Sequence, residues 1–359
     1  MKLMFYINTI SCGGAERVMV NLANQFVIKG HEVIFVTTYQ MDQEYEIDNR
    51  IERKILLERN DYNFLKKNWT CTRQLRKAIK KESPEVLISF MAEPNFRAIC
   101  ANWGLKTKNL VSVRNDPNRE YPNALFKFCA RLLYRFADCV VFQTKDAQGW
   151  FSKPIRKKSC IILNQVNQQF FQTEPAEVHK DIVTVGRLVE QKNHEMLIKA
   201  FAKIADKIDD NLIIYGDGDR KEVLVKLVND LQLTNRVFFP GVISDVPGMV
   251  RTAKIFVLSS FYEGLPNALI EAMVLGLPCI STDCPCGGSK ELFDGQKNGI
   301  LVPVNDENIL AEKMLYLIEN ETTRVQLGNR AKEAAQQFSP EVIFERWEAV
   351  IVRLAEKQL

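Results

Sequence analysis

Short runs of β-branched and aromatic residues alternate with segments of helical periodicity along the whole chain. Such runs are typical of buried strands, and the segments between them are long enough to form helices. We predict six strands in each half: residues 2–8, 32–38, 53–57, 86–90, 109–113 and 138–143, then residues 181–186, 211–216, 236–240, 254–260, 278–282 and 300–304. Helix-length crossovers between strands produce parallel sheets with helices on both faces. We therefore predict an α/β protein with two doubly wound, Rossmann-like domains.

The predicted linker is the polar segment 164–180, which contains Pro175. It separates a first domain of residues 1–170 from a second domain of residues 178–338. A ligand is expected where the carboxyl ends of the two sheets face each other across a cleft. Residues 341–359 form a last helix that needs a hydrophobic surface, and we count them with the first domain. The apolar positions of this helix, at helical spacing, are Val342, Ile343, Trp347, Val350, Ile351 and Leu354.

The composition is that of a globular protein without a membrane span. The 359 residues are 46% hydrophobic and 26% charged, which suits two hydrophobic cores and excludes a disordered chain. The longest stretch without a charge, Ser159–Thr173, has 15 residues, whereas a spanning helix needs about 18 apolar ones. No signal peptide is recognisable at the N-terminus, so we expect a cytoplasmic protein. The nine cysteines lack the paired spacing of metal or redox sites, and we expect Cys284 and Cys286 to form a turn.

A helix that follows the strand at 254–260 is the first candidate site. Pro266 fits the first position of this helix. Amides at such a helix start bind phosphate through their unpaired N–H groups and the positive end of the helix dipole. Glu263 and Glu271 suit the hydroxyls of a sugar and a ribose, although both could equally be carboxylates that only stabilise the helix end. The amides expected to bind phosphate belong to Asn267, Ala268 and Leu269.

The strand at 181–186 leads into a second candidate site. Arg187 and Lys192 follow this strand, and Asn193 is a suitable N-cap for the next helix. A guanidinium can bind phosphate oxygens bidentately, and a lysine adds a point charge. The two cations fit a diphosphate, although a Lys and an Arg on a surface loop are, when considered alone, more often solvated charges.

The glycine pair Gly13-Gly14 follows the first strand and allows a ligand to approach the backbone closely. It is not a dinucleotide fingerprint, because the three-glycine spacing is absent. The next strand also ends in Thr rather than in the acid that binds a nicotinamide ribose. The pair alone is a weak signal.

Together these motifs resemble family 4 of the retaining glycosyltransferases, over nearly the whole chain. The pattern Glu263…Glu271 is diagnostic only in combination with the Arg187…Lys192 loop. The resemblance implies the two-domain B-type glycosyltransferase (GT-B) fold, with the nucleotide sugar in the second domain, the acceptor in the first, and a last helix that crosses back to the first. The motifs that carry it are Gly13-Gly14, Gly186-Arg187…Lys192, Tyr215-Gly216-Asp217-Gly218, Pro240-Gly241, Glu263-Gly264…Asn267…Glu271 and Gly287-Gly288…Glu291.

The resemblance also implies roles for individual residues. Arg187 and Lys192 would hold the diphosphate and stabilise its leaving charge, Glu263 would contact the donor sugar, and these three are the expected catalytic residues. Glu271 would bind the ribose. No cofactor, metal ion or protein nucleophile is expected. The other expected donor-binding residues are Gly13, Gly14, Asp217, Gly218, Val242, Ile243, Asn267, Ala268 and Leu269.

One segment of the chain departs from the family pattern, and another resembles a motif of a different class of glycosyltransferases. Many members carry a His after the strand that corresponds to residues 109–113, where this chain has Arg114-Asn115-Asp116. We assign these three residues to the acceptor site. The motif Asp217-Gly218-Asp219 imitates the metal-binding aspartates of A-type glycosyltransferases, but two carboxylates alone are a poor ligand set, and its place favours a loop near the nucleotide.

The net charge of +4 conceals an asymmetry. Residues 1–170 hold 27 Lys and Arg against 16 Asp and Glu, a net charge of +11, whereas residues 171–359 hold 21 against 28, a net charge of −7. Lys127, Arg131 and Arg135 recur every four residues and form a basic stripe beside Phe126, Phe128, Leu132, Leu133 and Phe136. The second basic cluster comprises Lys66, Lys67, Arg73, Arg76, Lys77, Lys80 and Lys81.

Basic amphipathic helices bind anionic membranes or phosphate groups, or they are the solvated face of a helix that covers a sheet. Two of them in a strongly basic half favour the membrane. We therefore expect peripheral association with the cytoplasmic face of the inner membrane, and we count Lys127, Arg131 and Arg135 with the acceptor site.

The expected function is retaining, metal-independent transfer of a hexosyl or N-acetylhexosaminyl group. The donor would be a nucleotide sugar, with UDP as the nucleotide, and the acceptor a hydroxyl of an undecaprenyl-diphosphate-linked glycan in surface polysaccharide biosynthesis. Nucleic acid is not an expected partner, because no docking motif is present and the second half is acidic. The alternative is a catalytically silent scaffold that binds sugar nucleotides in a glycan assembly complex. The presence of Glu263, Glu271, Arg187 and Lys192 argues against that alternative.

Overall fold

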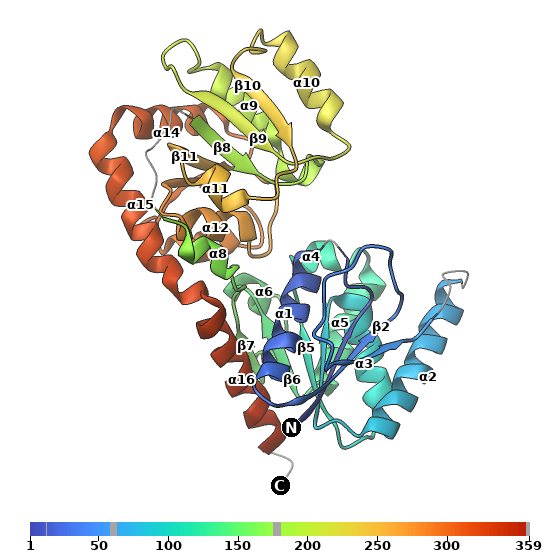
Figure 1. The fold of residues 1–359 in the computed structure, drawn as a ribbon. Coiled ribbons are helices and arrows are strands. Elements are labelled where there is room, and N and C mark those ends of the chain that lie inside the picture. Colours follow the sequence, from blue (N-terminus) through green and yellow to red (C-terminus); the bar gives the residue numbers. More distant parts are fainter. Residues whose placement is uncertain (12, 58–62, 175–180, 357–359) are drawn as a thin grey trace. The chain divides into compact units, whose positions relative to one another are not determined.

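The computed structural model describes residues 1–11, 13–57, 63–174 and 181–356. It divides into two compact units, Met1–Gln165 with Glu341–Leu359, and Val166–Pro340. Each unit is built on one sheet with helices on both of its faces (Figure 1). The predicted α/β architecture is therefore confirmed.

The sheet of the first unit has seven strands in the order β3-β2-β1-β4-β5-β6-β7, and all neighbouring strands are parallel. Six of the strands were predicted. The seventh, β7, was missed because it is a three-residue edge strand without a fully buried residue. The strands are β1 Lys2–Ile7, β2 Glu32–Thr37, β3 Glu52–Ile55, β4 Val86–Phe90, β5 Lys108–Ser112, β6 Cys139–Phe142 and β7 Ser159–Ile161.

Alternate side chains of these strands pack against helices on opposite faces of the sheet, as a period of two residues requires. On one face, Met4 and Tyr6 of β1 pack with residues of α2 and α3. On the other face, Phe5 contacts Phe26 of α1. Figure 1 shows α1 and α16 on one side of the sheet and α2 and α3 on the other. The helices of this unit are α1 Gly14–Ile28, α2 Phe64–Glu82, α3 Ala92–Asn102, α4 Pro117–Glu120, α5 Ala124–Leu133, the 3₁₀ helix η1 Tyr134–Phe136, α6 Lys145–Gly149, α7 Lys153–Arg156 and α16 Pro340–Glu356.

The last helix, α16, belongs to the first unit, as the family resemblance implied. Phe344 lies 4.8 Å from the ring of Phe26 on α1, and Trp347 lies 5.5 Å from the ring of Phe90 on β4. Both side chains are almost fully buried. The chain therefore returns to its first sheet after completing the second unit.

The sheet of the second unit has six strands in the order β10-β9-β8-β11-β12-β13, again all parallel. The strands, all predicted, are β8 Asp181–Val185, β9 Asn211–Tyr215, β10 Val237–Gly241, β11 Ile255–Leu258, β12 Cys279–Thr282 and β13 Ile300–Val302. The helices are α8 Gln168–Gln172, the 3₁₀ helix η2 Glu190–Lys192, α9 His194–Ala202, α10 Lys221–Asp230, α11 Val246–Val250, α12 Asn267–Val274, α13 Gly288–Phe293, α14 Glu307–Glu319, α15 Glu321–Ala335 and the 3₁₀ helix η3 Gln336–Phe338.

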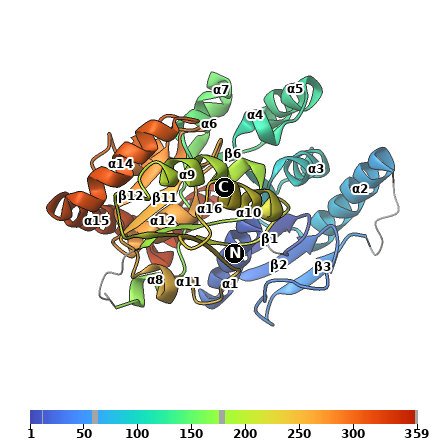
Figure 2. The same cartoon turned by 90° about the horizontal axis from the view of Figure 1, so that it is seen from above.

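One hydrophobic cluster joins β8, β9, β11 and β12 to α9, α10 and α14. The helix α12 packs on β11 and β12 and contacts α8 and α15. In Figure 2, α9 and α14 lie on one side of β11 and β12, and α8, α11 and α12 lie on the other. The second sheet is thus also covered on both faces.

The expected linker at 164–180 is partly helical. The amide of Val166 donates to the carbonyl of Phe338 over 2.9 Å, and α8 contacts α12. Residues 166–170, which we expected in the first domain, therefore fold with the second unit, and Phe170 is buried. The remainder of the expected linker, residues 175–180 with Pro175, lies outside the described residues.

The strand orders place a switch point in each sheet. Successive strands run outward in one direction from β1 and in the other from β4, and the same reversal occurs between β8 and β11. Ligands of doubly wound sheets bind at the carboxyl ends of the strands next to such a point. The loops after these four strands are therefore the first place to look for a site.

Two further features bear on the earlier expectations. No helix within the described ranges is both long enough and apolar enough to cross a membrane. The eight cysteines in the described part of the chain are all free thiols, while Cys12 lies outside it.

The contact of α16 with the first sheet can be tested with Phe344→Ala. Removal of a buried phenyl ring leaves a cavity, and we expect the free energy of unfolding to fall by about 3–5 kcal/mol. Urea unfolding followed by tryptophan fluorescence measures this, because Trp347 lies on the same helix. The control Glu345→Ala, at an exposed position of α16, should change the free energy of unfolding by less than about 0.5 kcal/mol. Equal effects of the two substitutions would contradict the packing described.

Candidate functional site

A buried ion pair joins the loops that follow β8 and β11 in the second unit. The Nζ atom of Lys192 lies 2.6 Å from Oε1 of Glu263. The Glu263 side chain is 8% exposed and that of Lys192 is 16% exposed. Because β8 and β11 are the two strands at the switch point, the predicted catalytic residues Lys192 and Glu263 meet where the topology places a ligand.

Glu263 is held by its own loop and by the loop after β12. Its Oε1 atom also accepts a hydrogen bond from Ser260 Oγ over 2.7 Å. Its amide donates to the carbonyl of Pro285, and its own carbonyl accepts from the amide of Cys286, over 2.6 and 2.7 Å.

Burial, with a smaller contribution from the charge of Glu263, raises the pKa of Cys284 to about 12, so this thiol is protonated and unreactive at neutral pH.

The loop that carries Lys192 is equally constrained. It ends in η2, and Asn193 then adopts a left-handed conformation (φ 47°) while its side chain accepts a hydrogen bond from the amide of Met196, as its predicted N-cap role requires. Ser259 Oγ donates to the carbonyls of Lys192 and Asn193, at 3.0 Å each. Burial and the charge of Lys192 lower the pKa of His194 to about 4, so this imidazole is neutral at pH 7.

Close backbone contacts bring the loops after β8 and β9 together. Gly216 has φ of 134°, and a Cβ atom there would collide with the carbonyl oxygen of Gly186. A Cβ atom on Gly218 would collide with the carbonyl of Leu188. Gly186 in turn lies against the methylene groups of Lys192. Only glycine allows this approach, so the glycines of the Gly216-Asp217-Gly218 motif shape the loop beneath Lys192.

The start of α12 differs in part from our expectation. The helix begins at Asn267, and Pro266 is its N-cap residue rather than its first helical residue. The carbonyl of Pro266 therefore accepts hydrogen bonds from the amides of Leu269 and Ile270, over 3.1 and 3.2 Å. The prediction that the Leu269 amide is unpaired was wrong. Asn267 and Ala268, both half-buried, are the first two residues of the helix.

The other predicted donor residues lie around these loops. Arg187 is exposed, and within the described residues no hydrogen bond or ion pair engages its guanidinium. Glu271 lies half-buried one turn into α12. Val242, 78% exposed, and Ile243 follow β10, next to the loop after β9. All of these residues follow carboxyl ends of strands in one sheet.

Both aspartates of the Asp217-Gly218-Asp219 motif are exposed to solvent. Asp217 accepts a hydrogen bond from the amide of Gly218 over 3.0 Å and lies 3.8 Å from Lys221 Nζ. Asp219 is also exposed. Within the ranges described, no cluster of three His, Cys, Asp or Glu side chains has the geometry to hold a metal ion.

In the first unit, Gly13 and Gly14 form the start of α1, after β1. Gly13 is the N-cap residue and Gly14 the first helical residue, which is exposed. A Cβ atom on Gly13 would collide with the carboxyl group of Glu16, so that carboxyl folds back over the helix start. Burial raises its pKa. The position that an anionic ligand would use is therefore occupied by a side chain of the same helix.

The three residues at the place of the expected histidine are mostly structural. The guanidinium of Arg114 is buried, donates to Asn164 Oδ1 and lies 4.7 Å from the ring centroid of Phe90. Asp116 is buried and caps α4 by accepting from the amide of Asn118 over 2.9 Å. Asn115 is half-buried. The Arg114–Asp116 loop follows β5, at the carboxyl end of the first sheet, where an acceptor site is expected.

The basic stripe on α5 is shorter than predicted. The α-helix ends at Leu133 and the 3₁₀ helix η1 begins at Tyr134, so Arg135 lies outside the α-helix that carries Lys127 and Arg131. Arg131 lies over the ring of Trp150, 4.4 Å from its centroid. An apolar stripe on the same helix is exposed instead, formed by Leu125, Phe128 and Leu132.

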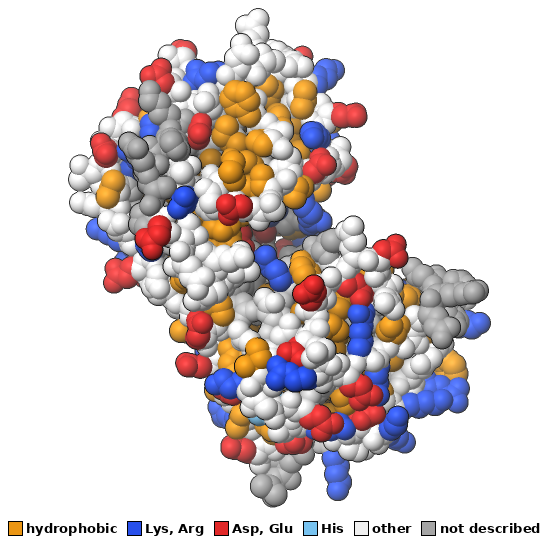
Figure 3. Space-filling view, in the orientation of Figure 1, with side chains coloured by type: hydrophobic (Ala, Val, Ile, Leu, Met, Phe, Trp, Pro, Cys, Tyr) orange, Lys and Arg blue, Asp and Glu red, His pale blue; other side chains and the backbone are white. Residues whose placement is uncertain are grey.

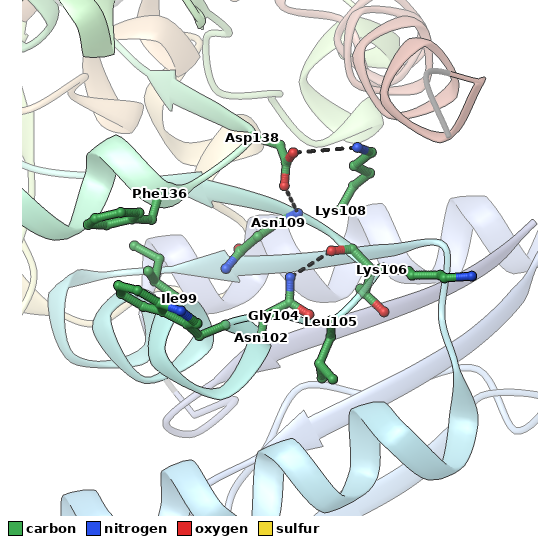
Figure 4. Close-up of a pocket in the computed structure, with 11 residues that line it drawn as sticks. Ile99, Asn102, Gly104, Leu105, Lys106, Lys108, Asn109, Phe136 and Asp138 are labelled. Atoms are coloured by element: carbon green, nitrogen blue, oxygen red, sulfur yellow. Dashed lines mark hydrogen bonds and ion pairs between the residues drawn. The ribbon is translucent and has the colours of Figure 1, made fainter. Parts of the chain in front are cut away.

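A separate cavity of about 250 Å³ lies at the amino end of β5, away from these loops. Figure 4 shows the side chain of Asp138 joined to Lys108 and to Asn109. Trp103 and Phe136, with ring centroids 4.7 Å apart, line it as well. None of the predicted site residues lines this cavity.

Sequence reasoning missed the residues that hold the ion pair in place. Ser259, Ser260 and the carbonyl of Pro285 support Lys192 and Glu263. The sequence offered one signal for these contacts, the two adjacent serines at the end of an apolar strand. A buried hydroxyl group at such a position needs a hydrogen-bond partner in a neighbouring loop. Pro285 contributes its backbone carbonyl, which every residue type has, so its identity could not reveal this contact.

Two family models match the chain. The model described as Glycosyltransferase Family 4 matches residues 12–170, and the model described as Glycosyl transferases group 1 matches residues 165–334. The two matches overlap at residues 165–170, close to the division between the compact units.

Curated relatives match over nearly the full length. A Campylobacter jejuni enzyme named GalNAc-alpha-(1->4)-GalNAc-alpha-(1->3)-diNAcBac-PP-undecaprenol alpha-1,4-N-acetyl-D-galactosaminyltransferase is 30% identical, over 99% of each chain. A second enzyme of C. jejuni, named N-acetylgalactosamine-N,N'-diacetylbacillosaminyl-diphospho-undecaprenol 4-alpha-N-acetylgalactosaminyltransferase, is 28% identical over 94% of this chain and 95% of its own.

Solved structures share the fold at low sequence identity. Sucrose-phosphate synthase from Thermosynechococcus elongatus superposes with a TM-score of 0.84 at 18% identity, covering 98% of both chains. HepE from Anabaena, in complex with UDP, has the same TM-score and identity, covering 98% of this chain and 100% of its own.

The packing of the loops can be tested with Gly216→Ala. The added methyl group forces the loop at Gly186 to move, and the positive φ strains any L-residue, so we expect the melting temperature to fall by several degrees. The control Gly295→Ala also places an L-residue at a positive φ, but at 65°, in the milder left-handed region, and with open space around the new methyl group. Differential scanning calorimetry should show the larger loss for Gly216→Ala. A loss no greater than that of Gly295→Ala would contradict the close contact.

Proposed function

Because the chain belongs to family 4 of the glycosyltransferases, we propose that it moves a hexosyl or N-acetylhexosaminyl group from a UDP-sugar to a hydroxyl of an undecaprenyl-diphosphate-linked glycan. The anomeric configuration of the donor is retained, and no metal ion takes part. The product extends a surface polysaccharide or a related lipid-linked glycan.

The observation that carries this proposal is the Lys192–Glu263 ion pair at the β8/β11 switch point. An ammonium group has three N–H donors, and Glu263 takes one of them. The others, with the exposed guanidinium of Arg187, face the diphosphate and neutralise the charge that develops as the glycosidic bond breaks. The amides at the start of α12 bind the same phosphates.

Glu263 has two functions in this proposal. It orients the ammonium group of Lys192, and its second carboxylate oxygen is available to the hydroxyls of the donor sugar. Ser260 and the backbone contacts to residues 285 and 286 keep the carboxylate in place. A preorganised, buried pair of this kind needs no rearrangement during the reaction, which is the main advantage of electrostatic catalysis in a protein.

The acceptor class is supported by the relatives. Both C. jejuni enzymes are named for glycans carried on undecaprenol through a diphosphate, and the first aligns over 99% of each chain. The first unit, with its net basic sequence, is the part that we propose receives this acceptor. An anionic lipid diphosphate is the type of ligand that such a surface attracts.

The surface of the first unit supports contact with the membrane that carries the acceptor. Leu125, Phe128 and Leu132 on α5 are 66%, 63% and 42% exposed, an unusual degree of exposure for large apolar side chains in a row. An apolar groove of about 250 Å³ lies beside them, lined by residues of α2, α3 and α5. Lys and Arg side chains project in the region of α2 (Figure 3). We therefore propose that α2 and α5 rest on an anionic leaflet.

Lys192→Ala and Glu263→Gln test the role of the ion pair. We expect each to lower kcat by about 10²–10³-fold, because a buried charge that stabilises the leaving diphosphate is lost or left without its partner. Release of UDP from a radiolabelled UDP-sugar, in the presence of the lipid-linked acceptor, measures turnover. The control Lys199→Ala, on the exposed face of α9, should retain wild-type activity.

Two results of this experiment would contradict the proposal, and each has a different meaning. A wild-type protein that binds UDP-sugars but turns over none of them would identify the chain as a silent scaffold. An active enzyme in which Lys192→Ala keeps full turnover would disprove the role of the ion pair.

Charge reversal on α5 and η1 tests the membrane contact. Replacing Lys127, Arg131 and Arg135 with Glu removes three positive charges, each worth about 1 kcal/mol near an anionic surface, and should abolish binding to vesicles that contain anionic lipid. Flotation of the protein with the vesicles measures this. As a control, reversal of three exposed lysines of the second unit, Lys203, Lys207 and Lys226, should leave flotation unchanged. Unchanged flotation of the α5 variant would contradict the proposed orientation.

A further inference from the structure

The apolar groove between α2, α3 and α5, of about 250 Å³, is a concave surface in the first unit that the packing of the chain leaves uncovered. In Figure 2, α3 lies between the other two helices. The exposed apolar side chains of its lining are Phe64 and Leu65 of α2 and Leu125 of α5. Phe96 of α3 and Phe126 of α5 line it as well. Apolar walls of this kind are left in contact with water unless a ligand covers them.

The polar side chains that line the groove already have partners in the first unit. The guanidinium of Arg97 donates to Asn68 Oδ1 and to Asn8 Oδ1, over 2.7 Å each. It also donates to the carboxylate of Glu93. The hydroxyl of Thr72 donates to the carbonyl of Asn68 over 2.7 Å. A hydrocarbon can therefore cover the apolar lining without depriving these polar groups of their hydrogen bonds.

The polar end of the groove, formed by Glu93 and Arg97, lies at the switch point of the first sheet. Glu93 is in the first turn of α3, directly after β4, and Asn8, the partner of Arg97, directly follows β1. The strand order reverses between β1 and β4. Ligands of doubly wound sheets bind next to such a point. The groove thus begins where a substrate is expected.

Cationic side chains flank the groove on two of its helices. Lys67 of α2 precedes the lining residue Asn68, and its Nζ atom lies 3.7 Å from Glu93. Lys127 of α5 follows the lining residue Phe126. Positive charge beside an apolar groove suits a ligand that has an anionic head group and a hydrocarbon chain.

We propose that the α2–α3–α5 groove binds the isoprenoid chain of the acceptor, at the isoprene units next to the diphosphate. This inference rests on the proposed function, because it names the part of the lipid-linked acceptor that the first unit recognises. Isoprene units are flat and branched, so they pack closely against phenyl rings such as those of Phe64, Phe96 and Phe126. The groove thereby distinguishes a glycan on its carrier lipid from the same glycan free in solution.

Two cysteines in the groove can report whether it is occupied. Cys100 of α3 is exposed, Cys129 of α5 is half-buried, and both line the groove. A ligand in the groove would shield Cys100 from alkylation by iodoacetamide, a reaction of the thiolate that is best followed at pH 8.5. Cys160 lines a different cavity, beside α16, and is the internal control.

The experiment follows the alkylation of Cys100 by mass spectrometry, with farnesyl diphosphate as the probe. A probe concentration about ten times its Kd leaves about a tenth of the protein free, so alkylation of Cys100 should slow about tenfold. Alkylation of Cys160 should not change. Inorganic diphosphate, which has no chain, should give no protection, and dodecyl phosphate should give less than the isoprenoid.

Two results of the alkylation experiment would overturn the inference. Unchanged alkylation of Cys100 in the presence of farnesyl diphosphate would show that the chain does not enter the groove. Equal protection by dodecyl phosphate would show a general hydrocarbon site and would overturn the assignment to an isoprenoid.

Filling the groove tests its part in the reaction. Cys100→Phe replaces a small side chain of the lining with a phenyl ring, so the isoprenoid loses apolar contact, and KM for the undecaprenyl-diphosphate-linked acceptor should rise at least about tenfold. KM for the same glycan on a short, water-soluble aglycone and the Kd for UDP should not change. The control Gln74→Phe, at an exposed position of α2 outside the lining, should follow the wild type. An equal rise of KM for both acceptors would overturn the inference.

The outcomes separate this inference from the proposed function. An active enzyme whose Cys100 is not protected by farnesyl diphosphate overturns the assignment of the groove alone. A protein whose Cys100 is protected, but which transfers sugar to no lipid-linked acceptor, overturns the proposed function and with it the role of the groove in acceptor binding.

Discussion

The close packing of four backbone loops is the constraint on which the site depends. The loops after β8, β9, β11 and β12 approach so closely that Gly216, Gly218 and Gly288 have no room for a Cβ atom. The loops after β8 and β11 are joined in turn by the Lys192–Glu263 ion pair and by the hydrogen bonds of Ser259 to the carbonyls of Lys192 and Asn193. A buried ion pair contributes little net stability, because the desolvation of both charges offsets their attraction. Its presence at the carboxyl edge of the sheet is consistent with the proposed binding of the donor diphosphate there.

The charge distribution of the chain now has a structural basis. The second half of the sequence is acidic, yet it holds the site proposed for the diphosphate, because the positive charge is local, at Lys192 and Arg187. The first half is basic over its surface, with exposed apolar side chains on α5 beside the cations. Local charge suits a small ligand in a defined site, whereas a broad basic and apolar surface suits an extended anionic one such as a membrane.

Much of the fold and part of the site could be predicted from the sequence. Twelve strands followed from apolar runs and their spacing, whereas the short edge strand β7 has too little buried surface to give such a run. Arg187, Lys192 and Glu263 were identified as residue types at strand ends. The amides of Leu269 and Glu263 donate to the backbone carbonyls of Pro266 and Pro285. Contacts of this kind depend on the conformation of the loops, which cannot be read from the types of the side chains.

The central claim is that the loop of Lys192 and Arg187 binds the diphosphate of the donor. The most direct measurement is isothermal titration calorimetry of UDP and of uridine with the wild type and with Lys192→Ala. The wild type should bind UDP at least about a hundredfold more tightly than uridine, since charge-assisted contacts to the phosphates contribute several kcal/mol. Lys192→Ala should lose at least about tenfold of this preference while its affinity for uridine is unchanged. An equal preference for UDP in the two proteins would contradict the account.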